Sequence, residues 1–182
     1  MEKPIDVRFP IGKIENALFS KKEVYSPEAK LKYVHDMVNC PSLVHGTILD
    51  LDDEQVNTPY RQGGWTPKQI VHHLADSHMN GLMRFKLALT EETPVIKTYD
   101  QSAWAQLPDR VLSVDISLAM LTALHRKWVE IMQSMDEADW QKKIYHPEQQ
   151  REIPLWDMMG TYAWHGKHHA GQIMSLRTKM GW

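Results

Sequence analysis

The stretch "TPKQIVHHLADSHMNGLMRFKLAL", residues 66–89, decides the fold, because it joins a helix start to a long apolar stripe. Thr66 is a good N-cap, and Pro67 stands where a first-turn proline is tolerated. The apolar residues then recur at helical spacing: Ile70, Val71, Leu74, Leu82, Phe85 and Leu89. This pattern predicts an amphipathic helix that buries one face against other elements.

Three other segments carry helical signals of the same kind. Residues 27–51 follow Ser26 as N-cap, and Pro41 is expected to break or kink this helix before it resumes. A third apolar stripe runs from about residue 114 to 135, and a fourth from near residue 154 to about 179. Four amphipathic helices around one core predict an all-α fold, a four-helix bundle.

The connections between these helices are unusual. Residues 90–112 hold two prolines and no sustained period, and they are longer than most connections in a compact domain. They are expected to cross over between helices or to cover a site. Residues 142–155, "KKIYHPEQQREIPL", alternate in polarity around a turn at Pro147, which predicts a short β-hairpin.

Length and charge narrow the classes of protein. The 182 residues are expected to form a single domain, 1–182, and a net charge of −2 gives no electrostatic footprint for nucleic acid or an anionic membrane. The start of the chain lacks the apolar core of a signal peptide, and no apolar run approaches the ~20 residues of a membrane helix. Cys40 stands alone and is interpreted as a packed thiol. The sequence predicts a cytoplasmic protein without nucleic-acid or membrane partners.

Six of the ten histidines lie in two short windows: His72, His73 and His78 in the first stretch, and His165, His168 and His169 in "TYAWHGKHHAGQI", residues 161–173. Helical positions i and i+4 lie on one face about 6 Å apart, so His165 and His169 can reach a common cation. A third imidazole from the other helix would complete a three-histidine site with positions open for water or substrate. Catalytic zinc sites are built in this way.

The identity of the third ligand is open from the pattern alone. His73 shares a helix face with Asp76, Asn80 and Arg84, but a solvated polar face fits this pattern equally well, and periodicity does not exclude His72. His168 is either a donor to the site or a surface residue. Five single histidines are interpreted as surface or satisfied core residues: His35, His45, His78, His125 and His146.

Several catalytic motifs are absent from the sequence. Gly166, Lys167 and His168 separate the histidine pair, so the helix supplies no metalloprotease base of the HExxH type. There is also no GxSxG nucleophile, P-loop or dinucleotide fingerprint.

Four stretches have a more specific pattern: "GGWTPKQIVHHLADSHMN" from residue 63, "RFKLALTEETP" from residue 84, "YAWHGKHHAGQI" from residue 162, and the terminal "MGW". Together they resemble the YfiT-like branch of the DinB superfamily, a group of metal-dependent hydrolases with some bacillithiol S-transferases. The resemblance runs from "FPIGK" at residue 9 to the end of the chain. It implies a DinB-like bundle, a homodimer, and one divalent metal ion per chain, Zn2+ or Ni2+. It also implies the ligands His73, His165 and His169, and so favours His73 over His72.

A dication held by three neutral imidazoles lowers the pKa of bound water to about 7 and deprotonates a coordinating thiol. Asp76, one turn after His73, could orient that imidazole or act as a base, and Gln172 could hydrogen-bond a metal-bound ligand. The resemblance favours transfer of a low-molecular-weight, bacillithiol-like thiol to an electrophilic small molecule. The alternatives are hydrolysis by water activated at the metal, and a non-catalytic metal- or ligand-binding protein.

Overall fold

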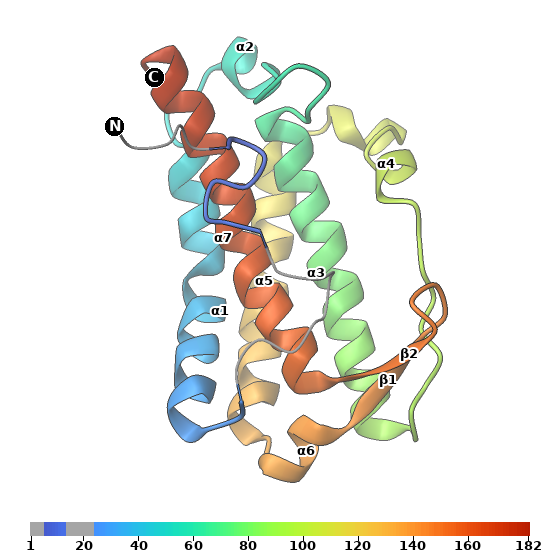
Figure 1. Cartoon of the computed structure of the whole chain (residues 1–182). Helices are drawn as coiled ribbons and strands as arrows, with labels where there is room; N and C mark the ends of the chain where they lie inside the picture. The colour runs from blue at the N-terminus through green and yellow to red at the C-terminus, as the bar shows by residue number, and fades with distance from the viewer. Residues whose placement is uncertain (1–5, 14–23) are drawn as a thin grey trace.

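The computed structural model describes residues 6–13 and 24–182, and four long helices dominate it (Figure 1). These are α1 (Pro27–Ile48), α3 (Pro67–Thr90), α5 (Val114–Ser134) and α7 (Leu155–Met180). Both α1 and α3 pack against α5 and α7, so α1 and α3 occupy opposite corners of the bundle. The predicted four-helix bundle is confirmed.

The direction of the helices explains the long connection. In Figure 1, α1 and α7 run one way along the bundle, and α3 and α5 run the other way. Because α3 and α5 are parallel, the chain must return along the length of α3, a distance of about 36 Å for its 24 residues. The returning segment contains the short α4 (Gln101–Trp104) and the 3-10 helix η1 (Pro108–Val111). The crossover expected at residues 90–112 is present.

The helices begin where their capping residues predict. Ser26 Oγ accepts the backbone N–H of Ala29 at 3.1 Å. Thr66 and Gln69 form a reciprocal capping box at the start of α3, in which each side chain bonds the other residue's backbone. The last helix, α7, ends at Met180 and is capped by Gly181. The φ of Gly181 is 74°, a left-handed conformation that glycine adopts without strain.

Of the break or kink expected at Pro41, the break is wrong, because α1 continues through this residue to Ile48. Proline lacks an N–H, so the carbonyl oxygen of Met37, four residues earlier, has no helical partner. Nδ1 of His125 on α5 lies 2.6 Å from that oxygen and donates a hydrogen bond in its place. A neighbouring helix therefore supplies the donor that the proline removes.

The remaining elements are short: α2 (Asp53–Val56), α6 (Glu137–Gln141), β1 (Lys143–His146) and β2 (Arg151–Pro154). Strands β1 and β2 pair antiparallel, which confirms the predicted hairpin. Ile144 faces Ile153 across the pair, and both are fully buried. Val95 also bridges to Tyr145, so the returning segment lies against this hairpin.

A layer of histidines divides the apolar core into two clusters. One cluster contains Met37, Leu82, Phe85, Trp128 and Ala163, and the other contains Cys40, Val44, Leu74, Leu121 and Ile173. Histidines occupy the intervening positions of α3, α5 and α7: His78, His125, His165 and His169. Polar side chains at the centre of a bundle need hydrogen-bond partners or a ligand, which makes this layer the place to look for a site.

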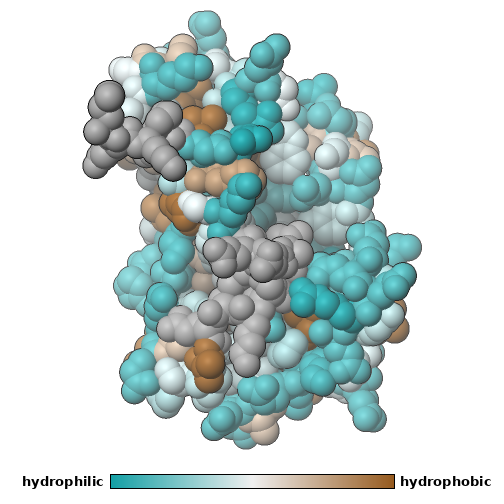
Figure 2. Space-filling view, viewed as in Figure 1, coloured by the Kyte–Doolittle hydropathy of each residue, from teal (hydrophilic) through white to brown (hydrophobic). Residues whose placement is uncertain are grey.

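None of the described helices is both long and apolar enough to cross a bilayer. Figure 2 shows a face covered mostly by hydrophilic side chains, with apolar residues in scattered patches.

Candidate metal centre

Three histidines converge between α3 and α7, and they are called the triad below: His73, His165 and His169. Nε2 of His165 lies 3.3 Å from Nε2 of His73 and 3.1 Å from Nε2 of His169. Two nitrogen ligands at about 2.0–2.1 Å from one tetrahedral ion are themselves about 3.3 Å apart. Both distances match those between ligands that share a single metal ion, and the ligand atoms of all three histidines lie within 4.8 Å of one another.

Gln172 determines which nitrogen of His169 faces the triad. Its amide Nε2 donates to the backbone oxygen of Arg8 at 3.2 Å and lies 3.3 Å from the hydroxyl of Tyr60. Its Oε1 consequently faces Nδ1 of His169, at 2.9 Å. A carboxamide oxygen only accepts, so Nδ1 carries the proton and Nε2 presents a lone pair to the triad.

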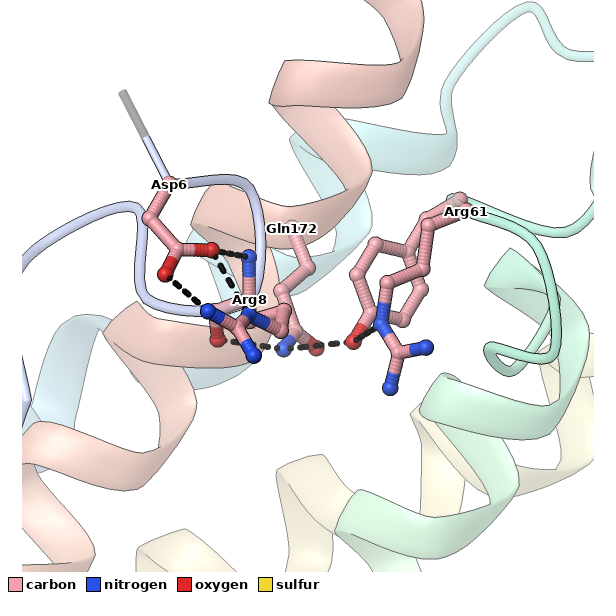
Figure 3. A network of polar contacts seen from close by, with 5 residues as sticks. Asp6, Arg8, Arg61 and Gln172 are labelled. Carbon is pink, nitrogen blue, oxygen red and sulfur yellow. Dashed lines mark hydrogen bonds and ion pairs between the residues drawn. The ribbon is translucent and has the colours of Figure 1, made fainter. Parts of the chain in front are cut away.

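Two short polar contacts adjoin the hydrogen-bond partners of Gln172. Asp6 accepts two hydrogen bonds from the guanidinium of Arg8, at 3.0 and 2.8 Å, and Arg61 donates to the hydroxyl of Tyr60 at 3.0 Å (Figure 3). This network places the Arg8 carbonyl and the Tyr60 hydroxyl on either side of the Gln172 amide, which sets the orientation of that amide.

A chain of buried hydrogen bonds determines the tautomer of His165. It begins at the Met37 carbonyl, which accepts from Nδ1 of His125, so Nε2 of His125 must accept in turn. This Nε2 lies 2.7 Å from Nδ1 of His78, and Nε2 of His78 lies 3.3 Å from Nδ1 of His165. Donor and acceptor alternate along the chain, which leaves Nε2 of His165 with a lone pair directed at the triad.

These tautomers make the triad a site for a cation. Two Nε2 lone pairs, on His165 and His169, face each other at 3.1 Å with no proton between them, and a positive ion would relieve their repulsion. Burial lowers the pKa of His73 to about 4. Burial and the neighbouring histidines hold the pKa values of His165 and His169 well below the usual value. All three side chains are therefore neutral at pH 7, as metal ligation by imidazole requires.

The triad opens into a cavity of about 740 Å³, within the range of about 300–1,000 Å³ typical of small-molecule sites. Aromatic side chains form much of its wall: Phe9, Trp65, Tyr99 and Trp164. Residues 98–102 of the returning segment also line it. The long connection thus covers the site as well as crossing between helices, so both functions expected for it are present.

Asp76 is placed differently from the role expected of it. It does not line the cavity, and within residues 6–13 and 24–182 no hydrogen bond joins its carboxylate to His73. Burial, together with the negative charge of Asp109, raises the pKa of Asp76 to about 6. Gln172 contacts the ring of His169, and its expected hydrogen bond to a metal-bound ligand stays a prediction.

The two histidines next to the triad residues have separate partners. His72 turns toward α5, where its Nδ1 lies 2.7 Å from the hydroxyl of Ser117. His168 is buried, stacks on Trp164 with ring centroids 4.3 Å apart, and has its Nε2 3.1 Å from the amide nitrogen of Gln172. Neither His72 nor His168 therefore directs a hydrogen-bonded ring nitrogen at the triad.

Sequence reasoning missed the parts played by His78, His125 and Arg84. The first two were interpreted as surface or satisfied core residues; both are indeed buried and hydrogen-bonded, but their place in series behind His165 was not foreseen. The one available signal was Pro41, because a proline inside a helix leaves the carbonyl four residues earlier without its helical donor. Arg84 lies on the cavity wall, on the same face of α3 as His73, as the helical pattern allowed.

A helical bundle whose three converging imidazoles face a cavity is typical of helical metal-binding proteins. Comparison with known proteins shows which family of them this chain resembles. The sequence profile of the DinB superfamily matches residues 38–173. Relatives in Bacillus mycoides and Bacillus thuringiensis are each 45% identical over 97% of this chain and 99% of their own length, and both are named, provisionally, metal-dependent hydrolases.

A solved structure agrees with these sequence matches. YfiT from Bacillus subtilis superposes with a TM-score of 0.91 at 39% identity, covering 98% of this chain and 99% of its own. It is described, also provisionally, as a metal-dependent hydrolase with an unusual four-helix bundle topology. This chain belongs to the DinB superfamily, as the resemblance in its sequence indicated.

Proposed function

We propose that this protein is a metal-dependent enzyme that transfers a low-molecular-weight thiol, such as bacillithiol, to an electrophilic small molecule. The proposal rests on three neutral imidazoles whose Nε2 atoms converge at the wall of a 740 Å³ cavity. His73, His165 and His169 would hold one Zn2+ or Ni2+. When bound, such an ion deprotonates a coordinating thiol and so supplies the nucleophile.

The carboxylates of the cavity favour a thiol over water as nucleophile. Asp100 accepts the backbone N–H groups of Ser102 and Ala103, at 2.8 and 3.0 Å, and thereby caps α4. Glu148, the other lining carboxylate, is exposed. Neither is held as a general acid or base, and hydrolysis of an ester or amide gains much of its rate from such a group. Thiol transfer needs no such general acid or base when the leaving group of the electrophile departs without being protonated.

The aromatic wall suits a second, less polar reactant. The Trp65 ring lies over His73, with centroids 4.6 Å apart, and stacks near His169 at 6.2 Å. It shields these imidazoles from water and fixes their orientation. The remaining cavity is large enough for a small electrophile beside the thiol, so both reactants would be held in contact.

Two other functions compete with this proposal. The provisional names of the relatives favour hydrolysis, in which water replaces the thiol. A non-catalytic metal- or ligand-binding protein would retain the triad without turnover. The three functions differ in what they require: a thiol, water alone, or no reaction.

The test compares electrophile consumption by zinc- or nickel-loaded protein with and without thiol. A bimane halide serves as electrophile, and an aryl ester serves as the hydrolytic substrate. We expect a rate above the uncatalysed reaction only when thiol is present, and no such rate with metal-free protein or His73→Ala. Thiol-independent ester cleavage would instead establish hydrolysis. Absence of turnover by fully metal-loaded protein would leave the binding function.

A further inference from the structure

Arg84 is a buried cation on the wall of the cavity. It is 8% exposed, and one of its terminal nitrogens donates to the backbone oxygen of Lys97 at 3.1 Å. It also hydrogen-bonds the phenol of Tyr162. An arginine has five N–H donors, so these contacts leave part of its fork-shaped donor set open.

The positive charge of Arg84 has no counter-ion in the described part of the chain, since no carboxylate there forms an ion pair with it. Keeping an unpaired charge away from water is costly, and natural proteins accept it mainly where a ligand completes the site. A neutral side chain could donate the hydrogen bond to the Lys97 carbonyl equally well, so this bond does not explain why a positively charged residue stands here.

Among the described residues, the carboxylates that line the rest of the cavity form no ion pair with Arg84. Of the lining carboxylates, Asp100 is engaged with the backbone of α4 and Glu148 is exposed. His146, also on the wall, has a lowered pKa through burial and the positive charge of Arg84, so it is neutral at pH 7. A dication at the triad would make the cavity more positive still.

We propose that Arg84 binds a carboxylate of the substrate that enters the metal cavity. His73 and Arg84 are eleven residues apart on one face of α3, which places their backbones about 16 Å apart along the helix. The substrate is accordingly an elongated molecule, with its carboxylate several bonds from the reacting atom. Planar, bidentate pairing with a carboxylate is what the open donors of arginine suit best.

The inference rests on the proposed function only in that the substrate occupies this cavity. It can be tested by measuring binding alone, without any catalytic reaction. Calorimetry would compare zinc-loaded protein binding ω-mercaptoalkanoates with ω-mercaptoalkanols of equal chain length, over a series of lengths. We expect the acids to bind about ten- to a hundredfold more tightly at the best length, since a hydrogen bond to a charged group contributes that much. Arg84→Gln should remove this preference and leave the affinity of the alcohols unchanged.

Two variants control for charge and folding. Lys86→Gln removes an exposed positive charge from the same helix and should keep the full preference. Arg84→Lys, which keeps the charge but loses the planar fork, should keep part of it and shift the best chain length. Equal binding of acid and alcohol by wild type, an undiminished preference in Arg84→Gln, or no acid binding at millimolar concentration would overturn the proposal. Failure of thiol transfer alone would leave the acid-to-alcohol ratio intact, which separates the two conclusions.

Discussion

Among the residues that the structure describes, two groups of side chains have the chemistry to hold a metal ion, and they differ in geometry. The triad is one, and the other is the sealed cluster of Cys40, His78 and His125. In the sealed cluster, Nδ1 of His78 lies only 2.7 Å from Nε2 of His125, the length of a hydrogen bond. Two nitrogen ligands of one ion would be about 3.3 Å apart, as the triad nitrogens are.

The positions of the ring protons explain why the histidines of the two groups differ in their capacity to bind a metal ion. In the sealed cluster each ring nitrogen that faces another carries or receives a proton, because the series ends on the Met37 carbonyl. Burial, with the nearby Asp36 charge, also raises the pKa of Cys40 to about 12, so the thiolate that a metal needs is not available. The triad has lone pairs without protons between them. Burial alone therefore does not make a metal site, whereas opposed acceptors do.

The largest effect is expected from removing a ligand of the triad. His165→Ala or His73→Ala should reduce bound metal from about one ion per chain to near zero, because two imidazoles do not hold a divalent ion tightly. His168→Ala, one residue from His169, should bind metal nearly as wild type does. Elemental analysis of untagged protein purified without chelator measures the ratio. Equal loss in His165→Ala and His168→Ala would show that the triad is assigned wrongly.

Acid should destabilise the metal-free protein through the buried histidines of both groups. Burial lowers the pKa of His125 to about 4, and an unfolded histidine titrates near 6.5. Between these values the unfolded state binds more protons, so the contribution is complete above pH 6.5 and is lost as the pH falls toward 4. The full change is about 3 kcal/mol of unfolding free energy for this residue.

Denaturant titrations of metal-free protein from pH 7 to pH 4.5 measure this loss. His125→Gln keeps an amide that can donate to the Met37 carbonyl but does not titrate, so its stability should fall less steeply with acid. Substituting the exposed His35 by Gln serves as the control and should leave the slope unchanged. Parallel slopes for wild type and His125→Gln would contradict a neutral His125 in the folded protein.

The sequence predicted the elements of the bundle closely, because local chemistry sets them. Capping residues at Ser26 and Thr66 start their helices where expected, and the spacing of His165 and His169 on one helical face is a property of the helix itself. The choice between His72 and His73 could not be made from the pattern. A helical wheel gives the faces of α3, but only packing shows which face meets α7.

The sealed cluster was beyond sequence reasoning for a different reason. Its function depends on the Met37 carbonyl, which Pro41 leaves without a partner, and on the donor that α5 brings to it. A proline inside a helix ordinarily predicts a break, and the prediction failed because the compensation is tertiary. The same contact makes His125 and His78 positioning groups for the triad.

A smaller effect is expected when His78 is replaced. His78→Ala leaves all three ligands but removes the acceptor that holds Nδ1 of His165. Loss of such a partner typically weakens metal binding about 10- to 100-fold. Competition with a chromophoric chelator measures the affinity. His72→Ala is the matched control, because His72 bonds Ser117 away from the triad. An unchanged affinity in His78→Ala would mean that the hydrogen-bond series does not orient the ligand.

The smallest effect on metal binding is expected from Cys40→Ala, and it separates the two groups most directly. Cys40 packs against Gly166, where an added Cβ would overlap its sulfur, so the thiol fills space beside the turn of α7 that carries His165. Removing it should lower stability by about 1 kcal/mol and leave metal stoichiometry and affinity unchanged. Chelator competition and thermal melting of the two proteins measure both quantities. A fall in affinity as large as that of His78→Ala would mean that the sulfur ligates metal, in which case the 2.7 Å contact between His78 and His125 would have to open on binding.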